Sequence, residues 1–199
     1  MRLFFEIVMG LTSVVGLTFI IERGLALRWN RVIPRAIEDA VNICGSEASR
    51  LEVRRACEAN PSPIARLILT ADEHLGLIKE ENENTLQTRA RQEIMLLERG
   101  LVVLEIVVGI APLLGLVGTI YGMMTLFGEL GQSSTTGDSA VLARGISLIL
   151  NFTMMGLLIA IPSLIAWNYY TKKVEMLAVE MESVCSEFLR RLYHEQTFK

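Results

Sequence analysis

Hydrophobic residues are grouped into three runs that are separated by stretches rich in charge. Residues 106–127 and 145–171 contain no formally charged side chain, and each run is long enough to cross about 30 Å of hydrocarbon as a helix. A shorter uncharged run covers residues 7–21. The pattern predicts an all-α membrane protein with transmembrane helices at about residues 4–21, 101–127 and 144–171.

The polar stretches between and after these runs are also typical of helices. Pro34 precedes a predicted helix start at Arg35, and Asn60-Pro61-Ser62-Pro63 predicts a break. From Ile64 to Arg99 we expect a helix that continues into the second span. We treat residues 1–199 as a single unit with a helical segment at 22–100, a loop at 128–143 and a tail at 172–199.

The tail has apolar residues at spacings of three and four, which predicts one apolar stripe on a helix. We interpret the stripe as a packing surface within the molecule or between subunits. It consists of Val174, Leu177, Met181, Val184, Phe188 and Leu192.

The distribution of positive charge predicts the topology. Four arginines follow the first span, Lys172 and Lys173 follow the third, and the loop at 128–143 has no Lys or Arg. The N-terminus is therefore expected outside and the C-terminus in the cytoplasm. A cleaved signal peptide is the alternative to a first span, but no A-x-A site follows the run and Arg2 is outnumbered by the arginines after it.

Composition excludes several classes of protein. The chain is 51% hydrophobic with a mean hydropathy of +0.41, which argues against an ordinary soluble domain. The net charge is −3 without a basic tract, so nucleic acid is not an expected partner. The three cysteines show no CxxC spacing and the two histidines have no ligand neighbours, so no metal or cofactor is expected. We found no enzyme motif such as GxxxxGK[ST] or HExxH and predict no catalytic activity.

Small residues occupy one face of each of the last two spans and predict close helix packing. The second span carries Ala111, Gly115, Gly118 and Gly122, and the third carries Thr153, Gly156, Ala160 and Ser163. We expect these faces to include the seam between subunits.

Two threonines are candidates for lining a cavity. Thr119 lies eight residues inward from Phe127, and Thr153 lies eight residues inward from Gly145. In an antiparallel pair of helices both would lie about 12 Å below the outer end. A ring of hydroxyls around a pore is one interpretation, and a hydrogen bond from each threonine to its own helix is the other.

The same spans lack acidic, basic and histidine side chains. A proton path through hydrocarbon normally needs a titratable side chain, and residues 106–127 and 145–171 contain no Asp, Glu, His, Lys or Arg. Glu105 lies about 33 Å from the outer end of the second span. If the protein conducts protons, we expect another chain to supply the carboxylate.

Several strings resemble a known family. Residues 97–101 read LERGL and residues 111–123 read APLLGLVGTIYGM, and ARGIS, TMMGL and AIP follow at 143–147, 153–157 and 160–162. They are similar to the second and third helices of the MotA/TolQ/ExbB proton channel family, and IERGLALR at 21–28 resembles the end of its first. Three spans with the large segment after the first match the ExbB/TolQ branch.

The resemblance implies a homopentamer in the bacterial inner membrane, with a periplasmic N-terminus. Its pore would hold an ExbD- or TolR-like single-span protein whose aspartate carries the proton, faced by Thr119 and Thr153. Proton flow would perform work on a TonB- or TolA-like protein. The expected packing or pore-face positions are Ala111, Pro112, Gly115, Gly118, Gly122, Gly156, Ala160 and Pro162.

One position departs from the family pattern. The family's third helix commonly reads ISEAL, whereas this chain has Leu148 after Ile146-Ser147. Ser147, Asn151 and Arg144 are further polar candidates in that region. The leading hypothesis is a proton-channel and stator subunit of a motor, and the alternative is a non-conducting helical membrane scaffold that assembles envelope partners. The sequence does not distinguish ExbB-like uptake from a TolQ-like envelope task.

Overall fold

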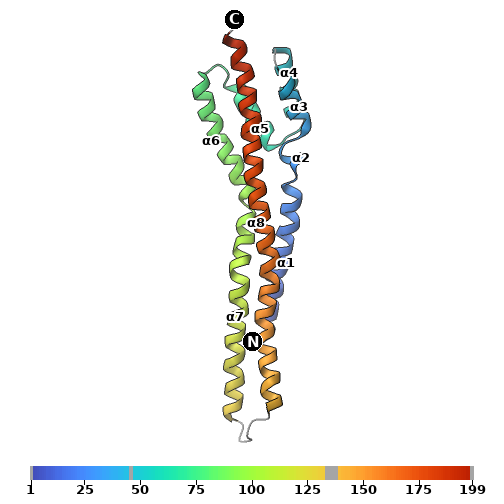
Figure 1. Cartoon of the computed structure of the whole chain (residues 1–199), viewed down its shortest axis with the longest axis vertical. Coiled ribbons are helices and arrows are strands. Elements are labelled where there is room, and N and C mark those ends of the chain that lie inside the picture. The colour runs from blue at the N-terminus through green and yellow to red at the C-terminus, as the bar shows by residue number, and fades with distance from the viewer. Residues whose placement is uncertain (1, 45–46, 133–138, 198–199) are drawn as a thin grey trace. The chain divides into compact units, whose positions relative to one another are not determined.

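The computed structural model describes residues 2–44, 47–132 and 139–197, and the regular structure in these residues is helical. The prediction of an all-helical chain is confirmed for this part of it (Figure 1). The helices are α1 (Arg2–Ala26), α2 (Trp29–Val32), α3 (Arg35–Ile43), α4 (Glu47–Ala59), α5 (Pro63–Glu73), α6 (Lys79–Glu98), α7 (Leu101–Gln132) and α8 (Ser139–Thr197).

Three helices are long and apolar enough to cross a membrane, as the hydrophobic runs predict. The candidate spans are Leu3–Ala26, Leu101–Gly128 and Leu142–Tyr193. The last is longer than the predicted span because α8 continues without interruption for 59 residues. The helix α8 therefore includes the tail at 172–199 up to Thr197.

The chain forms two compact units. Unit 1 comprises Met1–Arg23 and Gly100–Tyr169, and unit 2 comprises Gly24–Arg99 and Tyr170–Lys199. Each unit therefore collects segments that are far apart in the sequence.

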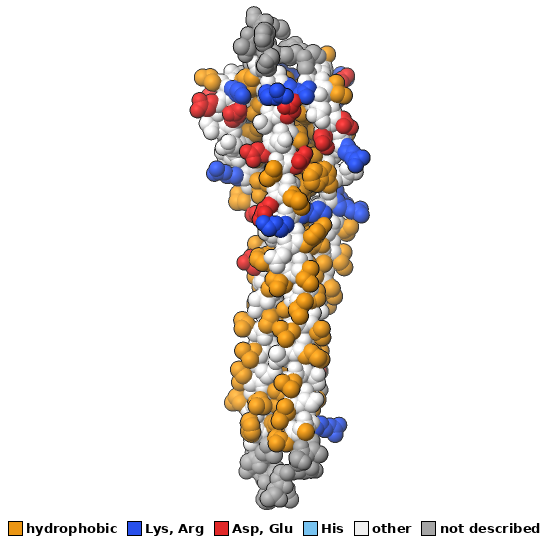
Figure 2. Space-filling view, viewed as in Figure 1, with side chains coloured by type: hydrophobic (Ala, Val, Ile, Leu, Met, Phe, Trp, Pro, Cys, Tyr) orange, Lys and Arg blue, Asp and Glu red, His pale blue; other side chains and the backbone are white. Residues whose placement is uncertain are grey.

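Unit 1 consists of α1, α7 and the first part of α8. A Cβ atom on Gly16 of α1 would lie 3.2 Å from the Ser163 Oγ of α8 and 3.4 Å from the Val107 Cγ1 of α7, so α1 contacts both helices. Most of the remaining apolar side chains point outward, and hydrophobic side chains cover much of the visible surface of this unit (Figure 2). An outward apolar surface on closed helices is the arrangement that a lipid environment requires.

Unit 2 is a helical cluster with an apolar core and a charged surface (Figure 2). The predicted stripe of α8 is buried within the chain, which confirms its packing function. Ile37 and Val41 of α3, and Leu67 and Ile68 of α5, belong to the same core.

The predicted helix boundaries at Pro34 and at residues 60–63 are confirmed. The helix α3 begins at Arg35, and α5 begins at Pro63 after an N-cap in which the Ser62 Oγ accepts a 3.3 Å hydrogen bond from the Ala65 N–H. The prediction of an uninterrupted helix from Ile64 to the second span is wrong. A turn at residues 74–78 separates α5 from α6, and Arg99–Gly100 separates α6 from α7.

A tertiary contact accompanies each interruption. The first allows α6 to pack against α5, so that Arg66 of α5 reaches Glu93 of α6. At the second, the Arg23 guanidinium of α1 lies against Gly100, where a Cβ atom would overlap it.

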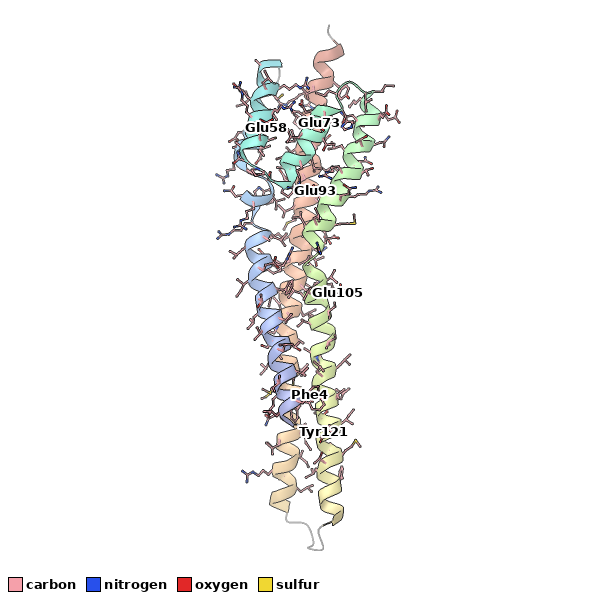
Figure 3. The ribbon with its side chains drawn as sticks, turned by 180° about the vertical axis from the view of Figure 1, so that it is seen from behind. Phe4, Glu58, Glu73, Glu93, Glu105 and Tyr121 are labelled. Carbon is pink, nitrogen blue, oxygen red and sulfur yellow. The ribbon has the colours of Figure 1, made fainter. Side chains whose placement is uncertain are left out.

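Buried polar groups join the helices of unit 2. The Glu93 carboxylate is 1% exposed and accepts a 2.8 Å hydrogen bond from the Arg66 Nε, with a further ion pair to Arg89 at 3.3 Å (Figure 3). Asn82 donates to the Ala71 carbonyl at 3.0 Å and to the Tyr193 phenol oxygen at 3.2 Å. These bonds connect α8 to the α5–α6 pair.

Candidate functional site

The small residues of α7 and α8 bring the two backbones into direct contact. A Cβ atom on Gly115 would lie 2.8 Å from the Phe152 carbonyl oxygen, and one on Gly156 would lie 2.7 Å from the Ala111 carbonyl oxygen. Neither approach is open to a larger residue, because the opposing atoms belong to the backbone. The contact is what a small-xxx-small pattern permits between membrane helices.

The same contact continues toward the ends of the two helices that the loop joins. A Cβ atom on Gly118 would lie 3.0 Å from the Phe152 Cβ, and one on Gly122 would lie 2.7 Å from the Ile149 Cγ1. Ala111 and Ala160 are also buried. These glycines are therefore occupied by a contact within one chain, which differs from the expectation that their faces form the seam between subunits.

The contacts define the register between α7 and α8. With Gly118 opposite Phe152 and Gly122 opposite Ile149, Thr119 lies level with residue 151. Thr153 is then two residues, about 3 Å, deeper along the helix axis than that level. The two threonine positions thus lie at nearly the same depth in the pair.

The hydroxyl of Thr119 is engaged with its own helix. It donates a 2.6 Å hydrogen bond to the Leu116 carbonyl, three residues earlier, and the side chain is half-buried. The remaining lone pairs of that oxygen are able to accept a hydrogen bond. Thr153 is also half-buried, and its Cα lies 3.1 Å from the position of a Cβ on Gly115.

The other polar candidates of α8 lie on a different face. Arg144, Ser147 and Asn151 follow one another at spacings of three and four, and all three are exposed. Asn151 and Thr153 are two residues apart, which is about 200° around a helix. The structure therefore does not bring Asn151 and Thr153 to one surface of α8.

Two prolines and Leu148 are the remaining residues that the sequence singled out in the second and third spans. Pro112 lies half-buried inside α7, and Pro162 lies exposed inside α8. Each ring removes a backbone N–H and so leaves one carbonyl a turn earlier without its helical partner. Leu148, at the position of the family glutamate, is 43% exposed.

Glu105 lies on the same face of α7 as Pro112 and Thr119. The three follow one another at intervals of seven residues, and a helix face drifts only about 20° per seven residues. The Glu105 side chain is exposed (Figure 3). This seven-residue spacing is the sequence signal that relates Glu105 to the threonine.

An aromatic cluster is a feature that sequence reasoning missed. The Phe5 ring of α1 lies 5.8 Å from the Tyr121 ring of α7 and 6.3 Å from the Phe152 ring of α8, measured between centroids. Phe152 also covers Gly118. The first helix is thereby fixed against the level at which Thr119 lies.

No group of ligands capable of holding a metal occurs among the residues that the structure describes. The Nδ1 of His74 lies 2.8 Å from the Thr70 carbonyl oxygen, one turn earlier in the same helical region. The side chains of His194, Glu129 and Asp138 lie outside the described residues.

Comparison with known proteins gives a family match over more than half of the chain. A model of the family described as the MotA/TolQ/ExbB proton channel family matches residues 59–183. An ExbB-like biopolymer transport protein of Synechocystis is 29% identical over an alignment of 192 residues that covers 92% of this chain and 89% of that protein.

Two further relatives match shorter segments. The biopolymer transport protein ExbB of Helicobacter pylori strain J99 is 38% identical over 82 residues, which are 41% of this chain and 56% of the relative. That of Salmonella typhimurium is 31% identical over 112 residues, which are 56% of this chain and 46% of the relative. The chain thus spans about half the length of these two relatives.

Proposed function

Because the chain belongs to the MotA/TolQ/ExbB proton channel family, we propose that it is the channel and stator subunit of an inner-membrane motor. The observation that carries the proposal is that Thr119 and Thr153 lie at nearly the same depth in a pair of apolar helices. Residues 106–127 and 145–171 of this pair contain no Asp, Glu, His, Lys or Arg. Such a pair of helices provides hydroxyl groups for a proton path but no side chain that carries a formal charge. The carboxylate that carries the proton is then the contribution of another chain.

The partner that fits is a single-span helix of the ExbD or TolR type with an aspartate at this depth. A threonine hydroxyl has one donor and two lone pairs, so the Thr119 oxygen is able to accept a hydrogen bond from the protonated carboxyl. It donates to the ionised carboxylate when its bond to the Leu116 carbonyl is exchanged for that contact. Glu105, on the Thr119 face, lies toward the other end of the span and is the group that exchanges the proton there. The protein that receives the work is of the TonB or TolA type.

The assembly that we propose is a homopentamer around that partner, with the N-terminus periplasmic and the C-terminus cytoplasmic. The exposed apolar side chains of unit 1 support an oligomer within a bilayer, because both lipid and neighbouring helices are able to cover them. The seam between subunits uses side chains other than Gly115, Gly118 and Gly156, which are occupied within the chain.

Asn151 takes the place of the missing family glutamate in this proposal. It is exposed and level with Thr119, and it follows Leu148 by three residues. An uncharged amide hydrogen-bonds across helices in a membrane without the cost of burying a charge. Asn151 is therefore a contact to a neighbouring helix and not a proton carrier.

Reconstitution tests the proposal directly. The chain would be co-expressed with a single-span protein of the ExbD or TolR type from the same genome and purified in mild detergent. The copies would be counted by native mass spectrometry, and the complex would be placed in vesicles that contain a pH-sensitive dye. We expect five copies per complex and a proton flux that needs both proteins. Replacing the membrane aspartate of the partner with asparagine should abolish the flux.

The scaffold alternative gives a different result in the same experiment. A stable complex that carries no proton flux with the intact partner would support the scaffold and contradict the channel. A complex with a number of copies other than five would contradict the pentamer. The proton flux would still show whether the complex is a channel.

A further inference from the structure

The segment that joins α1 to α3 divides its side chains between the core of unit 2 and the surface. Leu27, Val32 and Ile33 are 0%, 1% and 0% exposed, whereas Arg28 and Arg31 are exposed. The buried side chains fix the backbone of this short segment. The exposed ones are therefore displayed from a constrained support and not from a free linker.

The exposed side chains of this segment carry positive charge without neutralisation. Arg28, Arg31 and Arg35 form no ion pair with any residue that the structure describes, and no acidic residue occurs between Glu22 and Glu38. Three other arginines of unit 2 are paired, Arg50 with Asp72, Arg66 with Glu93 and Arg190 with Glu187. Arg55 and Arg91 are unpaired within the described residues, but they are isolated from one another in the sequence. The three arginines thus form a local excess of cationic charge.

A tryptophan accompanies the arginines. Trp29 is 41% exposed although it lies between Leu27 and Val32, which are buried. It follows the candidate span Leu3–Ala26 by three residues. Tryptophan is enriched at the boundary between hydrocarbon and headgroups, because its ring has an apolar body and an N–H donor.

We propose that Arg28, Trp29, Arg31 and Arg35, the basic segment, bind the phosphates of anionic phospholipid headgroups at the membrane surface where α1 ends. Guanidinium groups bind phosphate oxygens in a bidentate manner, and a negatively charged lipid surface attracts basic residues within a Debye length. The apolar span that precedes the segment places it at that surface. Bound lipid sets the depth of α1 and anchors the adjoining end of unit 2.

Fluorescence quenching by brominated lipids tests this site in the full chain. The chain has two tryptophans, so a Trp167→Phe variant leaves Trp29 as the reporter. The variant would be placed in vesicles with equal fractions of brominated phosphatidylglycerol or brominated phosphatidylcholine. Each basic residue near an anionic surface contributes a factor of about five at low salt, so we expect a preference for the anionic lipid of roughly tenfold or more that decreases at high salt.

Charge variants in the same background test the arginines. The preference for brominated phosphatidylglycerol over brominated phosphatidylcholine should fall to nearly one in the triple variant Arg28→Gln/Arg31→Gln/Arg35→Gln. Part of the preference should remain when the same three arginines are replaced by lysine. Arg55→Gln/Arg91→Gln is the matched control, since both are exposed arginines of unit 2 that form no ion pair within the described part of the chain. Equal quenching by both lipids before substitution, or an unchanged preference in the triple variant, would overturn the proposal. So would an equal loss in the control.

Discussion

A Cβ atom on Gly156 would stand 2.7 Å from the carbonyl oxygen of Ala111. The next neighbour is also backbone, the Gly115 Cα at 3.3 Å, so that no rotamer change relieves the contact. Replacing Gly156 with alanine forces α7 and α8 apart. We expect Gly156→Ala to destabilise unit 1 by about 1–3 kcal/mol, which would appear as a lower unfolding temperature in detergent.

Gly109 provides the control for this substitution. It lies in α7, and an added Cβ there meets nothing within 4 Å. Gly109→Ala should leave the unfolding temperature unchanged or raise it, because alanine has the higher helix propensity. Equal unfolding temperatures for the two variants would contradict the close contact.

Local patterns were sufficient to predict the spans, the helix start at Arg35 and the break at residues 60–63. Each depends on residues adjacent in sequence: an uncharged run or a proline. The turn at residues 74–78 was not predicted, because a single Gly76 is a weak signal and the reason for the turn is the packing of α5 on α6. A sequence of one chain carries no record of which distant helix will cover an apolar face.

The candidate site was likewise predictable only as far as local spacing determines it. Counting residues from the span ends gave nearly equal depths for Thr119 and Thr153, since the rise of a helix is fixed. The small residues predicted close packing but not whether the neighbour is the same chain or a second copy, because Gly118 and Gly122 have the same spacing in either case. The separation of Asn151 from Thr153 around α8 was readable from their two-residue interval.

Glu93 is expected to be critical for unit 2. Its carboxylate is buried and accepts a hydrogen bond from Arg66, with Arg89 also paired to it. The two arginine side chains are 43% and 41% exposed, so water solvates them once the carboxylate is gone. Glu93→Leu therefore loses hydrogen bonds to a charged group, worth about 1.5–3 kcal/mol, and should lower the unfolding temperature. The exposed Glu83, which pairs with Lys79 at 3.5 Å, supplies the comparison. Glu83→Leu should change stability by about 1 kcal/mol or less, and a similar effect of both would argue against the buried pair.

The cysteines should be inert at neutral pH. Burial raises the pKa of Cys57 and of Cys185 from 9.0 to about 12, and Asp72 adds to the effect at Cys57. An unfolded thiol ionises near its ordinary value while the folded one keeps its proton, so unfolding releases protons between these limits. The free energy of unfolding is therefore not reduced by these thiols below about pH 9. It decreases as the pH rises from 9 toward 12, because the unfolded thiols ionise first.

Two measurements check the thiol prediction. Alkylation by iodoacetamide at pH 8 should be slow in the native protein and rapid in denaturant. A Cys57→Ala/Cys185→Ala variant should lose less stability than the native sequence between pH 9 and 11. Rapid alkylation of the native chain would show that these side chains are accessible.

The proposed topology needs introduced cysteines, because buried native thiols would resist labelling from either side of the membrane. Ala143 and Ser183 are exposed positions of α8, before and after the apolar part of the helix. A membrane-impermeant maleimide should label Ala143→Cys in spheroplasts and label Ser183→Cys only after lysis. The reverse pattern would invert the assigned orientation.

Thr119 and Thr153 should be required for proton-driven work and not for assembly. Valine is nearly isosteric with threonine but lacks the hydroxyl, so a carboxylate facing it is less well solvated, which raises the pKa of that carboxylate and hinders release of its proton. We expect Thr119→Val and Thr153→Val to reduce proton flux by tenfold or more, with unchanged insertion and copy number. Serine at either position keeps the oxygen and should retain part of the flux.

Thr125→Val distinguishes a pore hydroxyl from a general effect of losing a threonine. Like Thr119, Thr125 belongs to α7 and donates to its own helix, with a 3.0 Å bond to the Tyr121 carbonyl. It is six residues from Thr119, so it points about 120° away around the helix. Flux should be normal in Thr125→Val. Full flux in the doubly substituted Thr119→Val/Thr153→Val protein would show that neither hydroxyl belongs to the proton path.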